Sequence, residues 1–314
     1  MKFKNMPERH AAEFLINEIR EYTRTSTENR FPYDKNLLIF DEPLVRFADG
    51  DDPLFYEYKK IIAPTHVTPR ESLSKTYRKR PEELPESISV ISWILPITAA
   101  TRKTNRTETK MPSRLWAHTR WYGEFFNDAL RRHVVGLLKG NGFIAVAPML
   151  EKYWTRFEDT KTGPYSNYSE RHVAYVAGQG SFSLSDGFIS ERGIAHRCGS
   201  VVTNLKLPIS ERKATGPYSN CLFYANRSCK ACIQRCPCGA ITEKGHDKIR
   251  CDHYIRLEIG DLQSEYDVGM QGCGLCQTNV PCEDKNPVVN SEISRKKSRA
   301  SENLRGCHGC PVKV

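Results

Sequence analysis

Three closely spaced cysteines, the last followed by a proline, are the residues of this chain best suited to chemistry. Two residues separate Cys229 from Cys232, three separate Cys232 from Cys236, and Pro237 comes next. This spacing is typical of bacterial iron–sulfur proteins, in which the last cysteine ligates a different cluster from the others. The motif therefore predicts one-electron redox chemistry.

Five further cysteines complete a set of eight, which is enough for two [4Fe–4S] clusters. In the crossed ligation of bacterial ferredoxins, the first cluster would take Cys221, Cys229, Cys232 and Cys282. The second cluster would take Cys236, Cys251, Cys273 and Cys276.

The spacings of these cysteines differ from the standard run. Seven residues separate Cys221 from Cys229, and a tighter pattern would have a cysteine at Asn226; twenty-one residues separate Cys251 from Cys273. We interpret these differences as loop insertions, which are inexpensive in closure entropy. Zinc is the main alternative, since Cys-x2-Cys pairs also build zinc sites. An extra thiol follows each pair here, which favours iron–sulfur over zinc, and disulfides are less favoured still.

The remaining cysteines and the N-terminus bear on the compartment. Four cysteines are surplus to the clusters: Cys198, Cys238, Cys307 and Cys310. No apolar signal segment follows the first basic residues and no run of eighteen apolar residues occurs, so we expect a cytoplasmic protein without a membrane span.

Length and charge predict the organisation of the chain. We expect an α/β domain over 1–215, a ferredoxin-like module over 216–290 and a basic tail over 291–314. The net charge of +10 falls to about +6 once two clusters of about −2 are added. The tail is either solvated or contacts nucleic acid or an acidic redox partner.

The upstream part has a mixed pattern of helices and strands, which predicts an α/β (α+β) layer structure. Ser169 is a predicted N-cap and Gly178 a predicted C′ residue. Helices are expected over 12–22, 113–139 and 170–177, strands over 88–97, 143–147 and 199–205, and a polar loop over 101–110.

Nucleotide-binding motifs are absent from the sequence. There is no Walker loop, and Gly178-Gln179-Gly180 lacks the third glycine of a dinucleotide fingerprint. We expect a turn here that lets the backbone approach a flat ligand or another element.

The stretch from Ser169 to Leu205, followed by the cysteine module, resembles the epoxyqueuosine reductase family and its relatives, the reductive dehalogenases. Those families place an ER-x-x-A-x-x-AGLG helix end, a G-S-[VI]-[IV]-T-[DN]-L strand and a two-cluster module in this order. The matching positions are Glu170, Arg171, Ala174, Ala177, Gly178, Gly180, Gly199, Ser200, Val201, Val202, Thr203, Asn204 and Leu205.

This resemblance implies a nitroreductase-like domain that binds cobalamin without a protein ligand on cobalt. It implies that electrons pass from the outer cluster to the inner one, formed by the Cys236 set, and then to the corrinoid. On the same grounds, the residues expected near the corrinoid are Gly178, Gly180, Gly199, Ser200, Val201 and Thr203.

Three departures from the family pattern leave the reaction open. The family's essential aspartate corresponds to Pro164, its AGLG leucine to Gln179, and its lysine-bearing turn to the run 181–185, which has no lysine. Any reductive elimination needs a proton donor. The candidates are Asp159, Tyr165 and Tyr168, each of which also has an ordinary packing or surface explanation.

Two functions follow from these observations. The first is a corrinoid-dependent iron–sulfur reductase that acts on a small molecule or a modified nucleoside. The second is an electron carrier or reductive activator that has two clusters and no chemistry of its own. The expected partners are a low-potential donor such as ferredoxin or flavodoxin and a small-molecule substrate; tRNA is not favoured, since no basic stripe carries interleaved aromatic residues.

Overall fold

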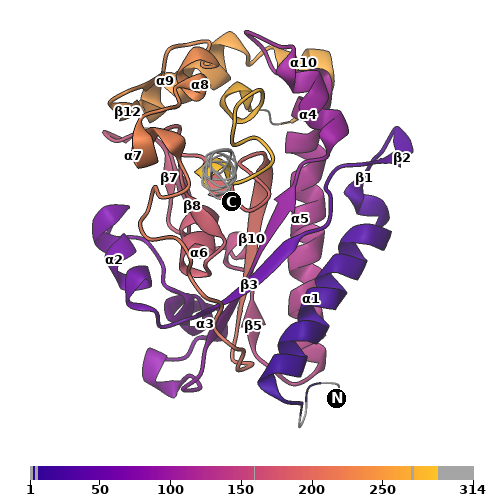
Figure 1. Ribbon diagram of the computed structural model, residues 1–314. Coiled ribbons are helices and arrows are strands. Elements are labelled where there is room, and N and C mark those ends of the chain that lie inside the picture. Colours follow the sequence, from indigo (N-terminus) through magenta and orange to yellow (C-terminus); the bar gives the residue numbers. More distant parts are fainter. Residues whose placement is uncertain (1–2, 4–5, 159, 270–271, 289–314) are drawn as a thin grey trace, which may run out of the picture.

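A four-stranded antiparallel sheet lies at the centre of the computed structural model, which describes residues 3, 6–158, 160–269 and 272–288 (Figure 1). The strand order is β3-β4-β10-β5. The bounds are β3 Leu44–Asp49, β4 Ser89–Pro96, β10 His196–Thr203 and β5 Ala145–Val146. The predicted mixture of helices and strands is confirmed, and every pairing in this sheet is antiparallel.

The sheet has an open edge close to the cysteine module. β5 pairs only with Val202 and Thr203, so the first half of β10 has no neighbour on that side. The Cys198 carbonyl at this edge accepts hydrogen bonds from Asn127 Nδ2 at 2.9 Å and from Arg131 Nη2 at 3.3 Å. Side chains of a helix therefore satisfy a backbone group that a further strand would otherwise pair.

Helices cover both faces of the sheet (Figure 1). α1 and α5 pack through Leu15, Ile19, Phe126 and Leu130 on the face that carries Trp93. The other face packs against shorter helices. The bounds are α1 Glu8–Thr25 and α5 Arg114–Gly140 on the first face, and α2 Pro53–Ile61, α3 Pro69–Tyr77 and α6 Glu170–Val176 on the second.

The elements with strong local periodicity match their predictions. α1, β4 and α5 are confirmed, and all eight residues of β4 are buried. β5 is shorter than the strand predicted over 143–147. Ser169 occupies the predicted N-cap position of α6, but its hydroxyl pairs with His172 Nδ1 at 2.8 Å and caps no backbone group.

The predicted turn at Gly178 is confirmed, with a φ of +73°. A Cβ at this residue would lie 2.5 Å from the Glu211 carbonyl oxygen. The glycine therefore lets another segment of backbone approach closely, which is the second of the two uses expected for this turn.

The loop predicted over 101–110 is wrong for most of its length, because Ala99–Arg106 forms helix α4. Polar residues suggested an exposed loop, yet Arg102 and Asn105 are buried. Asn105 Nδ2 donates to Thr278 Oγ1 at 3.1 Å, and Arg102 Nε donates to Glu283 Oε1 at 3.1 Å. Hydrogen bonds to residues far away in the sequence thus compensate for the burial of this polar helix face.

The cysteine-bearing segments lie together at one end of the sheet, at the top of Figure 1. They contain α7 Leu222–Asn226, α8 Ala231–Gln234, β11 Ile241–Thr242, β12 Gly245–His246, α9 Lys248–His253, a π-helical segment Tyr254–Glu258 and α10 Leu262–Tyr266. Three other short hairpins pair β1 Arg30–Phe31 with β2 Asp34–Leu38, β6 Arg156–Phe157 with β7 Tyr165–Ser166, and β8 Gly180–Phe182 with β9 Phe188–Ser190.

The predicted division into 1–215 and 216–290 stays a prediction, and the tail over 291–314 lies outside the described residues. Within the described ranges, no helix has the length and apolar character needed to cross a membrane.

Candidate functional site: two cysteine cages

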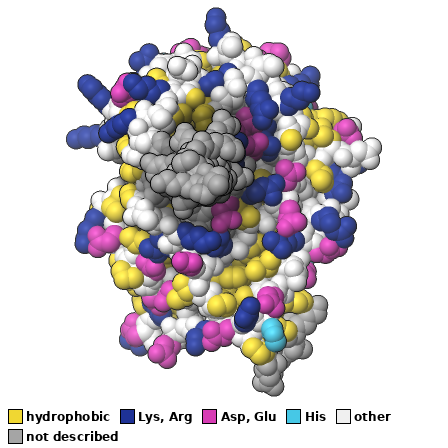
Figure 2. All heavy atoms as spheres, in the orientation of Figure 1, with side chains coloured by type: hydrophobic (Ala, Val, Ile, Leu, Met, Phe, Trp, Pro, Cys, Tyr) yellow, Lys and Arg dark blue, Asp and Glu magenta, His cyan; other side chains and the backbone are white. Residues whose placement is uncertain are grey.

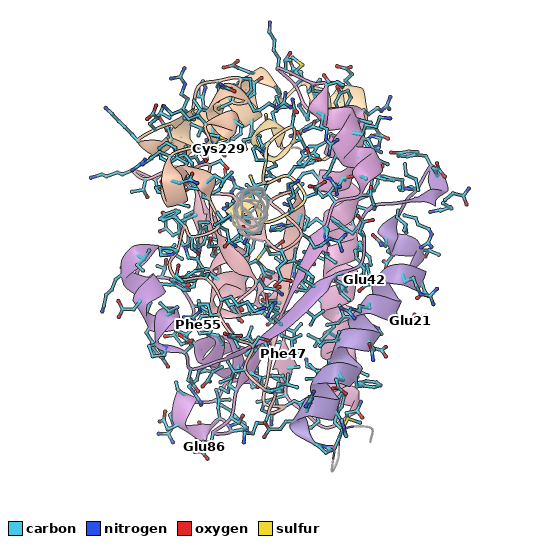
Figure 3. The ribbon with its side chains drawn as sticks, in the orientation of Figure 1. Glu21, Glu42, Phe47, Phe55, Glu86 and Cys229 are labelled. Carbon is cyan, nitrogen blue, oxygen red and sulfur yellow. The ribbon has the colours of Figure 1, made fainter. Side chains whose placement is uncertain are left out.

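Four of the predicted ligands surround one small apolar space, which we call the first cage: Cys221, Cys229, Cys232 and Cys282. Cys221 precedes α7, Cys232 lies in α8, and Cys282 comes from the segment that returns near the end of the described chain. Electrostatic interactions connect Cys232 and Cys282 to each other and to both remaining thiols. Figure 3 labels Cys229 in this upper part of the molecule.

The other four predicted ligands form a second cage: Cys236, Cys251, Cys273 and Cys276. Cys251 lies in α9, and Cys273 and Cys276 flank a short turn that contains Gly274. Gly274 has a φ of +62°, and a Cβ there would lie 2.1 Å from the Trp116 indole of α5. Since Cys276 lines the spaces of both cages, the two share a wall.

This grouping is the crossed arrangement expected from the spacing, although the ligand assignment itself stays a prediction. Among the described residues, no group of three or more His, Cys, Asp and Glu side chains is arranged to hold a single metal ion. Each set of thiols instead surrounds a shared space, as the donors of a multi-iron cluster must. The ten described cysteines are all free of disulfides.

The unusual spacers between the cysteines form helices, so their interpretation as loop insertions is wrong. The seven residues after Cys221 contain α7, and the long spacer before Cys273 contains the π-helical segment and α10. The long spacer is anchored on α5, where the Tyr266 carbonyl lies 2.7 Å from His118 Nε2. The extra length therefore builds contacts between the cages and the sheet domain.

Burial raises the pKa of several cage thiols, because a buried thiolate loses its solvation. The pKa values rise to about 12 for Cys232, Cys251 and Cys273, and neighbouring thiols add to the rise. A metal reverses this preference, since a coordinating thiol is deprotonated outright. Without a metal these three thiols are thus neutral near pH 7, and they would release protons on binding a cluster.

Arginines fix the cage segments to α4. Glu283, next to Cys282, is 3% exposed and accepts from Arg102 Nε at 3.1 Å and from Arg106 Nη2 at 2.6 Å. Arg235, next to Cys236, donates to the carbonyls of Asn105 at 3.0 Å and Thr278 at 3.1 Å. These bonds hold ligands from both cages in fixed positions relative to the sheet domain.

A cavity of about 240 Å³ extends from the second cage toward the sheet domain. Besides cysteines, its lining includes Trp116 and Arg120 of α5, His196 and Arg197 of β10, and Arg171 of α6. Guanidinium groups cannot lose their protons near neutral pH, so this side of the second cage is positively charged.

A network of partly buried ion pairs orients two of these arginines. Glu124 accepts from Arg197 Nη2 at 2.7 Å and from Arg131 Nη1 at 3.0 Å, and Arg120 Nη1 lies 3.5 Å away. Burial raises the pKa of Glu124, but Arg197, Arg131 and Arg120 outweigh it and hold the pKa at about 2. Glu124 therefore stays ionised and keeps the arginines in place.

The network continues to Glu170, which receives Arg131 Nη2 at 3.1 Å and the Ser200 hydroxyl at 2.6 Å. The Tyr168 hydroxyl lies 3.2 Å from Ser200 Oγ. Burial raises the pKa of Glu170 even though Arg131 opposes it, and burial raises the pKa of Tyr168 well above its usual value. Tyr168 is thus connected to the arginines of the cavity through this chain of side chains.

Neither Tyr165 nor Tyr168 lines this cavity. Tyr168 is 1% exposed within the apolar cluster on the α2–α6 face, and Tyr165 stacks on Phe157 with ring centres 4.8 Å apart. Asp159 lies outside the described residues. The role of proton donor stays a prediction for all three.

The residues predicted near the corrinoid line none of the three cavities that adjoin the cysteine cages. Gly180 packs on the Ile189 backbone and Gly199 on the Trp93 indole. The cofactor role stays a prediction for the whole set: Gly178, Gly180, Gly199, Ser200, Val201 and Thr203.

Sequence reasoning missed Arg120, Arg197 and their partner Glu124, whereas Arg171 was singled out only as part of the family pattern. A single charged residue on a long amphipathic helix does not indicate a functional site, because the solvent-exposed face of any such helix carries charged residues. Cys238 was noted only as surplus, although the sequence Cys236-Pro237-Cys238 places it beside a ligand.

Comparison with known proteins supports the resemblance that the motifs predicted. No family model matches the chain. A curated epoxyqueuosine reductase from Leadbetterella byssophila is 29% identical over 153 residues, which are 47% of this chain and 41% of the relative. The match thus spans less than half the length of that protein. The chain resembles epoxyqueuosine reductase, as its motifs predicted.

Solved structures give a weaker likeness. An epoxyqueuosine reductase crystallised with an epoxyqueuosine-modified tRNA-Tyr stem loop has a TM-score of 0.41 and 18% identity, over 87% of this chain and 66% of that one. A catabolic reductive dehalogenase in complex with 3-bromo-4-hydroxybenzoic acid has a TM-score of 0.46 and 13% identity, over 91% of this chain and 38% of that one.

Proposed function

We propose that this chain is an iron–sulfur oxidoreductase, similar to epoxyqueuosine reductase, that passes low-potential electrons through two [4Fe–4S] clusters. The observation that carries the proposal is the grouping of eight thiols into two cages that share a wall at Cys276. When bound, each cluster would accept and release one electron at a potential set by its surroundings.

The residues of the cages would hold the clusters and tune them. Cys221, Cys229, Cys232 and Cys282 would ligate the first cluster, and Cys236, Cys251, Cys273 and Cys276 the second. Arg120 and Arg197 would lie on the cavity side of the second cluster, where positive charge stabilises the reduced state. The cavity is the natural position for a small electron acceptor.

Cobalamin is the acceptor that the resemblance implies. Small-molecule pockets usually hold ~300–1,000 Å³, whereas the cavity beside the second cage holds about 240 Å³ and includes the cysteines themselves. The six residues implied for a corrinoid line none of the three cavities beside the cysteine cages. In this arrangement the described residues do not fit a corrinoid.

The poor fit favours a second candidate, an electron-transfer protein or reductive activator whose acceptor is another protein. Such a protein needs the cages but not an internal substrate site. A ferredoxin or flavodoxin would be its donor, and a cytoplasmic location would suit its reduced clusters.

Lys and Arg side chains project from the upper part of the molecule, where the cysteine segments lie (Figures 1 and 2). An acidic redox partner would find complementary charge there, whereas tRNA stays an unfavoured partner.

Cluster content tests the shared part of both candidates. Protein reconstituted anaerobically should contain about eight iron and about eight sulfide per chain. It should also show the electron paramagnetic resonance signal of reduced [4Fe–4S] clusters after dithionite. Zinc without acid-labile sulfide, or a colourless protein, would refute the proposal.

Titration with cobalamin separates the two candidates. Stoichiometric binding with a base-off absorption spectrum would establish the corrinoid-dependent reductase and would require the cavity to open. In that case, Tyr165→Phe and Tyr168→Phe should be compared for loss of turnover with cobalamin still bound. Absence of binding under the same conditions would establish the electron carrier.

A further inference from the structure

Cys238 is a fifth thiol at the second cage. Its Sγ lies 3.8 Å from Cys236 Sγ, and it lines the same cavity as the four predicted ligands. It also interacts electrostatically with Cys251 and Cys273. A [4Fe–4S] cluster takes four cysteine ligands, so the second cage has one thiol more than it needs.

One tight turn carries both sulfurs to this position. The Gly239 amide donates to the Cys236 carbonyl at 3.3 Å, and Gly239 has a φ of +66°, which a residue with a side chain adopts with difficulty. The Ala240 amide donates to Cys236 Sγ at 3.2 Å. The turn therefore presents two thiols, two positions apart, to one space.

We propose that Cys236 and Cys238 share one coordination position of the second cluster, so that either thiolate completes the site while the other thiol is free. The inference rests on the proposed function, since it needs a cluster in the second cage. In an exchange, the iron–sulfur bond to one cysteine breaks as the bond to the other forms. The incoming thiol releases a proton, the leaving thiolate takes one up, and no electron is gained or lost.

The surroundings of Cys238 make such an exchange accessible from outside. Cys236 and Cys238 also line an open surface groove together with Arg250, His253 and Glu258. A proton released there can reach solvent directly. The pair therefore faces solvent through this groove, where a reagent can reach the free thiol.

Single and double variants test the proposal by cluster content, a readout that does not depend on activity. Cys236→Ser and Cys238→Ser should each keep about eight iron per chain, whereas the double variant should fall to about four. Cys251→Ser is the matched control, because no spare thiol is assigned to that position, and it should also fall to about four. Cys198→Ser, which removes a thiol in a separate apolar cluster, should keep the full content.

Loss of half the iron in one single variant, with full content in the other, would overturn the proposal and identify one fixed ligand. If the unmodified protein contained no clusters, the proposed function itself would fail, which is a distinguishable result.

Alkylation of the unmodified reconstituted protein gives an independent test that needs no variant. Brief anaerobic treatment with iodoacetamide, followed by peptide mass spectrometry, should label Cys236 in some molecules and Cys238 in others, with about one label per chain at this pair. Label at only one of the two residues, or at neither, would contradict a shared position. The cluster absorbance recorded during labelling shows that the second cage stays loaded.

Discussion

Replacing Glu283 by glutamine should loosen the first cage, because this carboxylate connects the Cys282 segment to α4. Glu283 is 3% exposed and accepts from Arg102 Nε at 3.1 Å, Arg106 Nη2 at 2.6 Å and the Asn279 amide at 2.7 Å. The amide keeps the shape of the side chain but removes its charge, and it leaves the buried Arg102 with only its longer contact to the partly exposed Asp284, at 3.4 Å. Removing one partner of a buried pair costs about 3–5 kcal/mol. Since the Arg106 side chain is 45% exposed, we expect the lower end, about 3 kcal/mol.

Asp284→Asn is the matched control for this change. Asp284 has the same chemistry one residue later, but its side chain is 42% exposed and its contact with Arg102 is longer, at 3.4 Å. Exposed pairs contribute about 0–1 kcal/mol. Urea unfolding of the reconstituted protein, followed at once by circular dichroism and cluster absorbance, should show a much lower midpoint for Glu283→Gln than for Asp284→Asn. Equal midpoints for the two variants would refute the assignment of Glu283 as the anchor of this segment.

Three further predictions concern the cages, the sheet domain and pH. Cys232→Ser should lower iron from about eight to about four per chain while the signal of the second cluster persists; loss of all iron would contradict separate cages. Gly178→Ala should lower the unfolding midpoint, because its Cβ would meet the Glu211 carbonyl at 2.5 Å in a left-handed conformation. Gly136→Ala, at an exposed position of α5 with open space around it, should stabilise the protein by about 0.5–1 kcal/mol. Similar shifts in the two variants would argue against the close approach of the Glu211 backbone to Gly178. Burial lowers the pKa of His196 to about 4 and of His172 to about 3. As the pH falls below about 6.5, these histidines therefore take up protons in the unfolded chain but stay neutral in the folded one. The free energy of unfolding, which has its full value above this pH, should decrease by about 1.4 kcal/mol per histidine at pH 5.5. A constant urea midpoint between pH 7.5 and pH 5.5 would contradict this predicted loss of stability.

The amino-acid sequence alone determined the elements whose signal is local. The periodic apolar residues of α1 and α5 and the continuous apolar run of β4 specify their own conformations, since each needs only a neighbouring apolar surface to pack against. The division of eight thiols into two sets was also predictable. Ligation of a cluster restricts the spacing of its cysteines, and the run from Cys229 to Cys236 has such a spacing, which is recognisable in the sequence whatever fold surrounds it.

Tertiary structure decided the features that depend on distant partners. α4 is a helix with a buried polar face because Glu283, 181 residues from Arg102, provides the counter-charge. Local sequence gives no sign of that pairing, so a polar segment was expected to be a loop. The long spacer before Cys273 is likewise helical where it contacts α5.

The charge of the cavity and the fifth thiol were likewise decided only in three dimensions. Arg120 and Arg197 come from different elements and meet because Glu124 holds them both. Cys238 could be counted in the sequence, but only the turn at Gly239 places its sulfur beside the second cage. Sequence thus specifies which ligands are available, and packing specifies which of them share a space, because distances between side chains far apart in the chain are set by the fold.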